Sequence, residues 1–351
     1  MGKRWKIGLC TLLMSGCTIP IKVRTESAVT VRQPVKSEVR TEYVMHVDPG
    51  PLNEIALGTG ECCRCEAKVA VIELDGILNN SNFVGLYSAG ENPVAVFKEK
   101  LDAAAADPTV RCVVLRINSP GGSVAATDLL CHDLREFRQK TGKPVVALLM
   151  DIGAGGAYYL ATAADTIIAT PSSTVGGIGV LLNLYQATLA MEQLNFFDMT
   201  IRQGEHIDMA SPVRKLTEEE KTLFNDMAKE FHARFKEAIL VGRSRVKVNE
   251  QVFDGRIMSA KLAIEAGLVD RTGYLEDAIA TASALADVKQ AKTVMYRRSG
   301  DPARTLYATT SNRPIQNAVF PWSVPGADRA RLPLFLYMWQ ADPNLLRLTG
   351  L

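Results

Sequence analysis

The sequence predicts an α/β fold with a mostly parallel β-sheet. From about residue 68 onward, apolar β-branched runs typical of strands alternate with amphipathic stretches typical of helices. Strands and helices that alternate in this way favour right-handed crossovers, which connect parallel strands. The composition agrees with a globular core, because 47% of the residues are hydrophobic and 22% are charged.

The expected elements follow one another without an internal repeat. The first half has strands at 68–78, 110–117, 142–150 and 166–170 and helices at 93–106, 124–140 and after residue 155. From Thr217 the pattern becomes helical, because Thr217 and Glu220 have the spacing of a capping box. Two further helix-turn units follow, at 253–270 and 273–285. The tail from about residue 298 contains LPLFLYMWQ (332–340), which is too short to span a membrane and is expected to pack on the body or on a neighbouring subunit.

The N-terminus predicts export and a lipid anchor. Three basic residues precede a short apolar run, and the run ends in Met14, Ser15, Gly16 and Cys17. This tetrapeptide resembles a bacterial lipobox, so residues 1–17 are expected to be a lipoprotein signal peptide, with Cys17 lipidated. An ordinary or uncleaved signal segment is the alternative. Lipidation of Cys17 would anchor the protein to a membrane, on the periplasmic or extracellular side of a bacterial envelope.

Four segments are therefore expected: the signal peptide, a tether at 18–66, a folded domain at 67–290, and an extension at 291–351 rich in Pro and aromatic residues. The 40 basic and 38 acidic side chains nearly balance, so the chain has no large positive net charge that would attract nucleic acid. The seven cysteines do not contain the repeated C-x-x-C spacing of a zinc site, so no metal and no cofactor are expected. The pairing of the cysteines in CCRC (62–65) stays open.

Two glycine-rich bends carry the pattern of a catalytic site. The segment NSPGGS (118–123) follows a strand, and DIGAGGAYYLA (151–161) begins a helix. Backbone N–H groups in such bends, and at helix starts, stabilise a developing oxyanion. We expect Gly121 and Gly156 to supply them. No hydroxyl, thiol or amine stands at the second bend, where a nucleophile would be presented.

These segments resemble the signal peptide peptidase A (SppA) family of serine proteases, which is related to the ClpP/crotonase fold. The resemblance covers residues 68 to 285 and includes INSPGGS, AGGAYY, STVGGIGV, GEHIDMASP and VFDGRIMSAKLAIEAGLVD, in family order. It implies repeated β-β-α and β-α units with a mostly parallel sheet and added C-terminal helices. It also implies a ring- or bowl-shaped homo-oligomer that acts on signal peptides or other apolar polypeptides.

Three positions depart from the family pattern. Gly155 stands where the family has its nucleophilic serine, Ile207 where it has the lysine general base, and Gly177 where a helper serine steadies that lysine. Glycine offers no atom that can attack a carbonyl carbon, and isoleucine cannot accept a proton. An apolar residue at 207 also avoids burying an unpaired amine. The expected protein is a non-catalytic homologue that binds apolar peptides or acts as a scaffold, alone or with an active paralogue.

Other assignments remain open. An active peptidase with a relocated nucleophile would draw on Ser123, Ser172, Ser173 or Ser211, with His206 as base and Asp151 as orienting carboxylate. A crotonase-like acyl-thioester enzyme and a purely structural envelope protein are two further alternatives. His206 adjoins the missing lysine, but neighbouring side chains on an extended segment point to opposite faces. Tyr158 and Tyr159 are expected to be core residues at the start of a helix.

Overall fold

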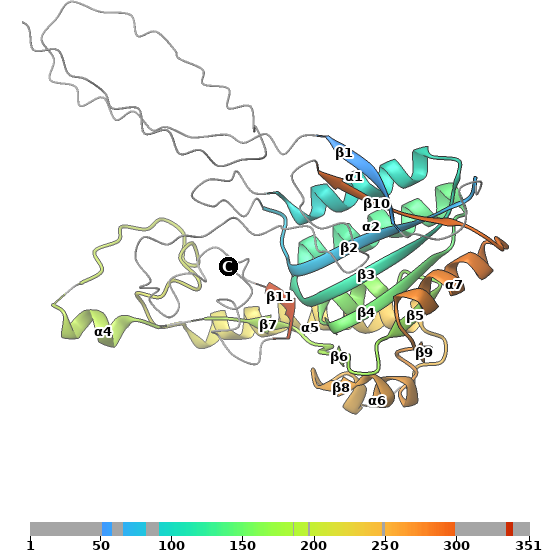
Figure 1. Cartoon of the computed structure of the whole chain (residues 1–351). Coiled ribbons are helices and arrows are strands. Elements are labelled where there is room, and N and C mark those ends of the chain that lie inside the picture. The colour runs from blue at the N-terminus through green and yellow to red at the C-terminus, as the bar shows by residue number, and fades with distance from the viewer. Residues whose placement is uncertain are drawn as a thin grey trace, which may run out of the picture. The chain divides into compact units, whose positions relative to one another are not determined.

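A mixed sheet of eleven strands organises the part of the chain that the computed structural model describes, residues 51–57, 66–81, 91–184, 186–195, 197–247, 250–298 and 335–339 (Figure 1). The strands are β1 (Leu52–Leu57), β2 (Lys68–Leu78), β3 (Val110–Ser123), β4 (Val145–Ala154), β5 (Thr166–Ala169), β6 (Thr174–Gly176), β7 (Leu181–Leu182), β8 (Ile257–Ser259), β9 (Arg271–Thr272), β10 (Lys292–Arg298) and β11 (Phe335–Met338). The helices are α1 (Pro93–Ala106), α2 (Val124–Thr141), α3 (Gly156–Ala161), α4 (Thr188–Gln193), α5 (Glu218–Gly242), α6 (Ala260–Glu265) and α7 (Leu275–Leu285), with a 3-10 turn at Glu250–Val252.

The centre of the sheet is parallel, as the sequence predicted. The main path runs β1-β10-β2-β3-β4-β5-β9, and every pair along it is parallel except β1 with β10. At the carboxyl end of β4 the sheet branches, because β6 pairs in parallel with the last residues of that strand. The α/β class with a mostly parallel sheet is confirmed.

Helices cover both faces of the sheet. Alternate residues of a strand point to opposite faces, so Val113, Leu115 and Ile117 of β3 join the main core beneath α1, α2 and α3. Their neighbours Cys112 and Val114 point the other way and pack with α7. A parallel sheet that is buried on both sides needs such nearly continuous apolar strands.

Local signals set the ends of the helices. The side chain of Asn92 accepts a hydrogen bond from the Val94 N–H at 2.9 Å and caps α1, whose first residue is Pro93. Gly142 ends α2 in the left-handed conformation. At α5 the predicted capping box is present: the Thr217 hydroxyl accepts from the Glu220 N–H at 3.1 Å, and the Glu220 carboxylate accepts from the Thr217 N–H at 2.9 Å.

The sheet extends beyond the domain expected at 67–290. Strand β1 belongs to the expected tether, and β10 and β11 belong to the expected extension. β10 lies in parallel beside β2, and β1 then pairs with β10 at the edge of the sheet. Both strands depend on contacts distant in sequence that local patterning does not reveal. The signal peptide and Cys17 lie outside the described residues.

Strand β3 is also longer than expected. The segment NSPGGS was predicted to be a turn, but β3 continues through it to Ser123. Gly121 and Gly122 pair with Ile77 and Leu78 of β2 on one side and with β11 on the other. Two partner strands hold this segment extended, although proline and glycine usually mark turns.

None of the helices in the described part of the chain is long and apolar enough to cross a membrane.

Candidate functional site

The junction of β4 and α3 forms the centre of the site. β4 ends at Ala154, α3 begins at Gly156, and Gly155 between them has φ +54° and ψ −127°. A residue with a Cβ is strained at such a positive φ, whereas glycine adopts it freely. A sharp strand-to-helix turn of this kind is the geometry that presents a nucleophile in many hydrolases. Here it presents only backbone.

The structure brings the predicted glycines together at this turn. A Cβ placed on Gly121 would lie 2.7 Å from the Gly156 nitrogen, and a Cβ placed on Gly177 would lie 3.2 Å from the Gly155 nitrogen. The Gly155 N–H itself donates to the Gly176 carbonyl at 2.9 Å. The positions that the resemblance assigns to the nucleophile, the helper serine and the two oxyanion donors are therefore neighbours in space.

One expected donor has a partner in this structure. The Gly121 N–H donates to the Ser119 hydroxyl at 3.1 Å, within the bulged end of β3. A Cβ placed on Gly156 would lie 2.3 Å from the Thr127 hydroxyl oxygen, so residue 156 packs directly against α2. Thr127 Oγ1 is buried without a hydrogen-bond partner among the described residues. The roles of Gly121 and Gly156 as oxyanion donors remain a prediction.

Strand β11 lies across this turn. It pairs antiparallel with Gly121–Ser123 of β3 and with β7, so it fills the space between these two strands. The Trp339 N–H continues the ladder by donating to the Pro120 carbonyl at 2.9 Å. The predicted packing of the apolar run in the tail against the body is confirmed. The sequence did not indicate that it would lie at the predicted catalytic turn.

The carbonyl of Tyr337 lies directly over the glycines. A Cβ on Gly155 would be 2.4 Å from the Tyr337 oxygen and 2.8 Å from its carbonyl carbon, and a Cβ on Gly121 would be 2.0 Å from the same oxygen. These distances are shorter than any real Cβ contact, so the strand approaches this closely only because both residues are glycine. A peptide carbonyl therefore lies against the position that the resemblance assigns to the family's serine.

Ile207 lies apart from this centre. It belongs to the segment between β7 and α5, residues 186–195 and 197–217, which we call the arm and which projects beyond the sheet (Figure 1). Its side chain is 72% exposed, so the expectation that an apolar residue here avoids a buried amine does not hold within the single chain. The exposed arm leaves the side chain at 207 surrounded by solvent rather than by the core.

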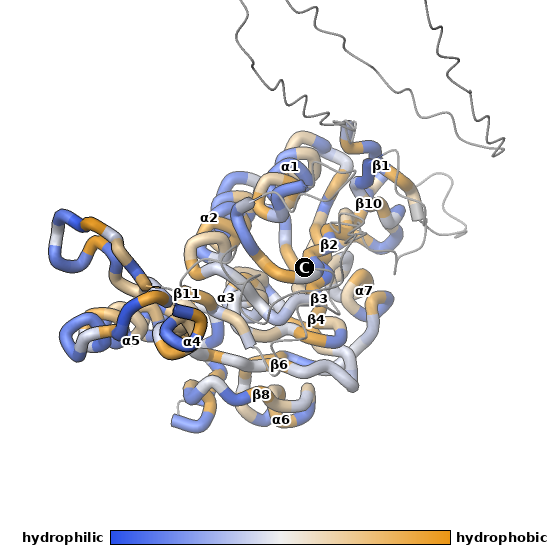
Figure 2. The backbone as a smooth tube through the Cα atoms, turned by 90° about the vertical axis from the view of Figure 1, so that its left-hand side faces the viewer, coloured by the Kyte–Doolittle hydropathy of each residue, from blue (hydrophilic) through white to orange (hydrophobic). Residues whose placement is uncertain are grey.

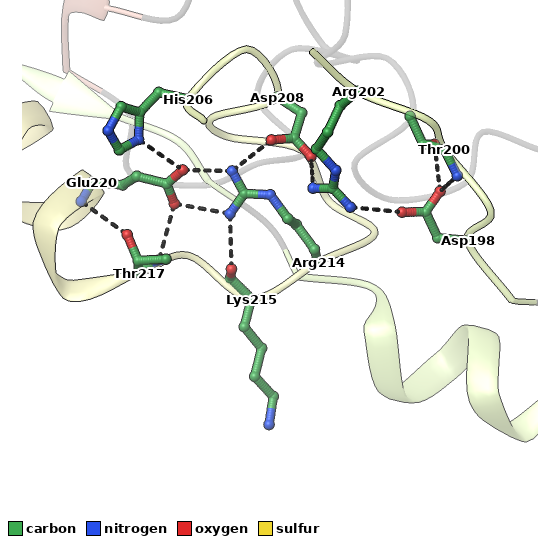
Figure 3. Close-up of polar contacts among 9 residues, drawn as sticks. All are labelled: Asp198, Thr200, Arg202, His206, Asp208, Arg214, Lys215, Thr217 and Glu220. Carbon is green, nitrogen blue, oxygen red and sulfur yellow. Dashed lines mark hydrogen bonds and ion pairs between the residues drawn. The ribbon is translucent and has the colours of Figure 1, made fainter. Parts of the chain in front are cut away.

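His206 faces α5 and not the glycines. Its Nδ1 lies 3.7 Å from the Glu220 carboxylate (Figure 3). Its Nε2 lies 3.9 Å from the Glu219 carboxylate. Arg214 donates to both oxygens of Glu220, at 2.9 and 2.5 Å, and to Asp208 at 2.8 Å. The Arg214 guanidinium lowers the pKa of Glu220 to about 2. This charged cluster ties the arm to the first turn of α5, and His206 belongs to it.

The candidate serines have structural contacts of their own. The Ser123 hydroxyl accepts from the Ala126 N–H at 3.4 Å and caps α2, and the buried Ser173 hydroxyl donates to the Leu149 carbonyl at 2.8 Å. Ser172 is exposed in the turn after β5, and Ser211 lies in the arm. No hydrogen bond joins any of them to His206 or Asp151 in the described part of the chain.

Two tyrosines and a group of one histidine and two glutamates carry side chains that could bind a ligand. Tyr158 and Tyr159 are buried as predicted, and the Tyr158 hydroxyl donates to the Leu268 carbonyl at 2.8 Å. Burial raises the pKa of Tyr158 above its usual range. Potential ligand atoms of Glu205, His206 and Glu219 lie within 4.8 Å of one another, but both carboxylates are exposed. The ring nitrogens of His206 already lie 3.7 and 3.9 Å from the carboxylates of Glu220 and Glu219.

Comparison with known proteins identifies the family. Residues 137–289 match the model of Peptidase family S49. A protein of Methanocaldococcus jannaschii named as a protease is 33% identical over 213 residues, which cover 60% of this chain and 68% of that protein. The chain belongs to peptidase family S49. A protein of Enterococcus faecium named as a signal peptide peptidase SppA is 28% identical over 246 residues, 70% of this chain and 71% of that protein.

The family assignment confirms the resemblance that the motifs indicated. Protease 4 of Salmonella typhi is 32% identical over 187 residues, but these cover 52% of this chain and 30% of that protein. The mixed α/β architecture, with its mostly parallel sheet, fits the ClpP/crotonase-like fold of family S49. Within that fold this S49 member has Gly155 at the turn after β4, with the Tyr337 carbonyl against it.

Proposed function

We propose that this S49 protein is a non-catalytic homologue that binds apolar peptides in the space between β3 and β7. The observation that carries the proposal is the turn at Gly155, which keeps the backbone of a catalytic turn and contacts a peptide carbonyl but has no side chain. Acyl transfer requires an activated nucleophile beside the scissile carbonyl. At this turn there is nothing to form the covalent bond.

The peptide-binding role is supported by the edges of β3 and β7 beside the turn, whose main-chain groups pair with an added strand. An extended peptide that adds a strand to a sheet gains main-chain hydrogen bonds and places alternate side chains in pockets. β11 has this arrangement between β3 and β7. A peptide held in this way would remain intact, because no base or nucleophile of the described chain lies against its carbonyl.

The arm supports a second part of the proposal, the homo-oligomer. Apolar side chains on it are exposed, including Met199 at 89% and Ile201 at 98%, and Figure 2 shows hydrophobic stretches on this projecting segment. Exposed apolar groups gathered on one extension mark an interaction site. We propose that a second copy of this chain covers the arm. Replacing Ile201 with Asp is expected to lower the oligomeric mass measured by light scattering, whereas the same change at Thr200 leaves it unaltered.

The localisation proposed is an envelope lipoprotein anchored through Cys17. The basic residues, the apolar run and the cysteine occur in the order of a lipoprotein signal. Metabolic labelling with a fatty-acid analogue in a bacterial host is expected to label the wild type and not Cys17→Ser. Equal labelling of both would exclude this anchor.

The experiment that tests the loss of catalysis uses a fluorophosphonate probe and casein, with an active serine peptidase as the positive control in the same buffer. Neither labelling nor casein cleavage above a mock preparation is expected for the wild-type chain. Specific labelling that is abolished by Ser→Ala or by Thr127→Val would overturn the proposal. It would favour the alternative with a relocated nucleophile, and Thr127 is included because its free hydroxyl packs against Gly156.

A further inference from the structure

Three side chains that can ligate a metal converge where the arm meets α5. Glu205 and His206 lie in the turn of the arm at 205–210, and Glu219 lies in the first turn of α5. One potential ligand atom of each residue lies within 4.8 Å of the other two. Imidazole nitrogens and carboxylate oxygens are both ligands of Zn²⁺. The expectation that no metal is bound rested on the spacing of the cysteines, and this cluster contains no cysteine.

The two ring nitrogens of His206 face different carboxylates. Nδ1 lies 3.7 Å from Glu220, whose side chain is 1% exposed, and Nε2 lies 3.9 Å from Glu219, whose side chain is 69% exposed. A histidine that ligates a metal through one nitrogen normally directs the other toward a carboxylate, which fixes the tautomer and the orientation of the ring. Glu220 stands in that outer position. Nε2 is then the nitrogen that faces the two exposed carboxylates.

Glu220 is held in place by groups outside the cluster of three ligands. Arg214 donates to both of its oxygens, at 2.9 and 2.5 Å, and the Thr217 N–H donates to one of them at 2.9 Å (Figure 3). The carboxylate behind His206 is therefore buried and fixed before any metal arrives. This arrangement distinguishes the cluster from a chance group of acidic side chains on the surface, in which nothing orients the ligands.

The distances and the charges also fit a divalent cation. Zinc lies about 2.0–2.2 Å from its nitrogen and oxygen ligands, so two ligand atoms of a tetrahedral site are about 3.4 Å apart. Nε2 and the Glu219 carboxylate are 3.9 Å apart, and the exposed side chains of Glu205 and Glu219 can rotate to close that gap. A neutral imidazole and two carboxylates carry two negative charges, which a dication balances. Calcium and magnesium prefer ligand sets made of oxygen alone, whereas imidazole suits zinc.

We propose that Glu205, His206 and Glu219 form a Zn²⁺ site that clips the arm to the start of α5. The three side chains leave one tetrahedral position, which a water molecule fills. Because Ile207 follows His206 directly, the metal also fixes the part of the arm that the resemblance assigns to the general base. The proposal is independent of the peptide-binding function and of the missing nucleophile.

The first test is calorimetric titration of Zn²⁺ into the full chain without a histidine tag. The five cysteines before residue 66 are replaced by serine in every protein, because thiolates bind zinc themselves. One site is expected. Glu205→Gln, His206→Ala and Glu219→Gln are each expected to weaken the affinity at least about tenfold, since losing a ligand costs no less than losing an outer partner.

Two matched variants separate a site from surface charge. Glu218→Gln removes a neighbouring carboxylate in the same turn of α5, whose side chain is 88% exposed, and should leave the affinity unchanged. His132→Ala removes an exposed histidine of α2 and should also leave it unchanged. Calcium chloride at the same concentrations is expected to compete only weakly, because the site contains a nitrogen ligand.

The second test reads the two histidines separately. Diethyl pyrocarbonate acylates accessible imidazole nitrogens, and mass spectrometry of peptides reports the extent at each histidine. In metal-free protein both His206 and His132 are expected to react. Zinc should protect His206 at least about tenfold and leave His132 reactive, because a nitrogen bound to the metal has no free electron pair.

Several outcomes would overturn the proposal. Equal zinc affinity in the wild type and in His206→Ala would show that the histidine is not a ligand. A loss of affinity in Glu218→Gln as large as that in Glu219→Gln would assign binding to the general charge of the helix start. Reactivity of His206 that zinc does not change would likewise refute the site, and none of these results bears on the loss of catalysis.

Discussion

Replacing Gly155 with alanine tests the close contact between the turn and β11. Two effects add at this position. A residue with a Cβ at φ +54° and ψ −127° lies outside the regions that such residues normally adopt, which costs about 1–3 kcal/mol. The new Cβ would also lie 2.4 Å from the Tyr337 oxygen and 3.1 Å from the Met338 Cα, so the strand must shift, and overpacking of this kind costs about 1–3 kcal/mol. The expected loss in the free energy of unfolding is roughly 2–6 kcal/mol.

Gly142→Ala is the control for a positive φ at a position without a neighbouring strand. Gly142 has φ +66° and ψ 5° at the end of α2, and a Cβ there would meet nothing within 4 Å. Its cost is therefore the strain of the left-handed conformation alone, about 1–2 kcal/mol. The difference between the two variants contains the contact with β11, about 1–3 kcal/mol, and the added strain of ψ −127° at Gly155.

Urea unfolding followed by circular dichroism gives both free energies of unfolding, provided that the slope against urea concentration is the same in the two variants. Hydrogen exchange then locates the change, which is expected in the fragment containing Gly121–Ser123 for Gly155→Ala only. If Gly155→Ala costs no more than Gly142→Ala and exchange at β3 stays the same, Tyr337 does not lie against Gly155. The close contact between the turn and β11 would then be refuted, although the missing nucleophile would not.

Three further results are expected. Arg214 lowers the pKa of Glu220 from 4.5 to about 2, so the stabilisation by this carboxylate is complete above pH 4.5 and is lost as the pH falls toward 2. In Glu220→Gln the free energy of unfolding should therefore fall less steeply between pH 4.5 and pH 2 than in the wild type. An equally steep fall in both proteins would contradict this. Burial raises the pKa of the thiols of Cys112 and Cys131 to about 12 and 11. Iodoacetamide at pH 8 should therefore alkylate these thiols only after unfolding. Intact-mass measurement with and without urea checks this. Lys100→Met leaves the buried carboxylate of Glu73 without the ammonium 2.8 Å away and should cost about 3–5 kcal/mol in urea unfolding, whereas Lys98→Met on the exposed side of α1 should cost less than about 1 kcal/mol.

The local signals in the sequence were sufficient for most elements of the domain. The capping box at Thr217 and Glu220 formed as predicted, and the apolar runs at 68–78 and 145–149 became buried strands of the parallel sheet. These predictions succeeded because they depend on side-chain periodicity and on contacts a few residues apart. Local patterns did not indicate which roles the positions around Gly155 correspond to, whereas the family motifs did.

The segment NSPGGS shows where local reasoning stopped. Its residues favour a turn, and the prediction of a turn was reasonable for the isolated segment. In the structure β2 and β11 pair with its two edges and hold it extended. Hydrogen bonds to strands that are distant in the chain outweigh a local preference that is worth about 1 kcal/mol.

The arm is a second region whose placement local sequence patterns did not predict. Ile207 was predicted to replace a catalytic lysine, and its sequence neighbours agree with that alignment. Its 72% exposure depends on how the arm leaves the sheet, which no pattern of residues indicated. His206 likewise gained its place from the carboxylates of α5 and not from the site.

By itself, the sequence determined that this chain has an α/β fold, that it resembles the SppA proteases, and that no hydroxyl or amine stands at positions 155 and 207. Side-chain chemistry is a property of each residue, so an absent group is visible without a structure. Only the tertiary structure decided that β11 lies between β3 and β7 with the Tyr337 carbonyl against Gly155. That contact joins segments about 180 residues apart, and its formation depends on the combined hydrogen bonding and packing of the whole domain rather than on local propensity.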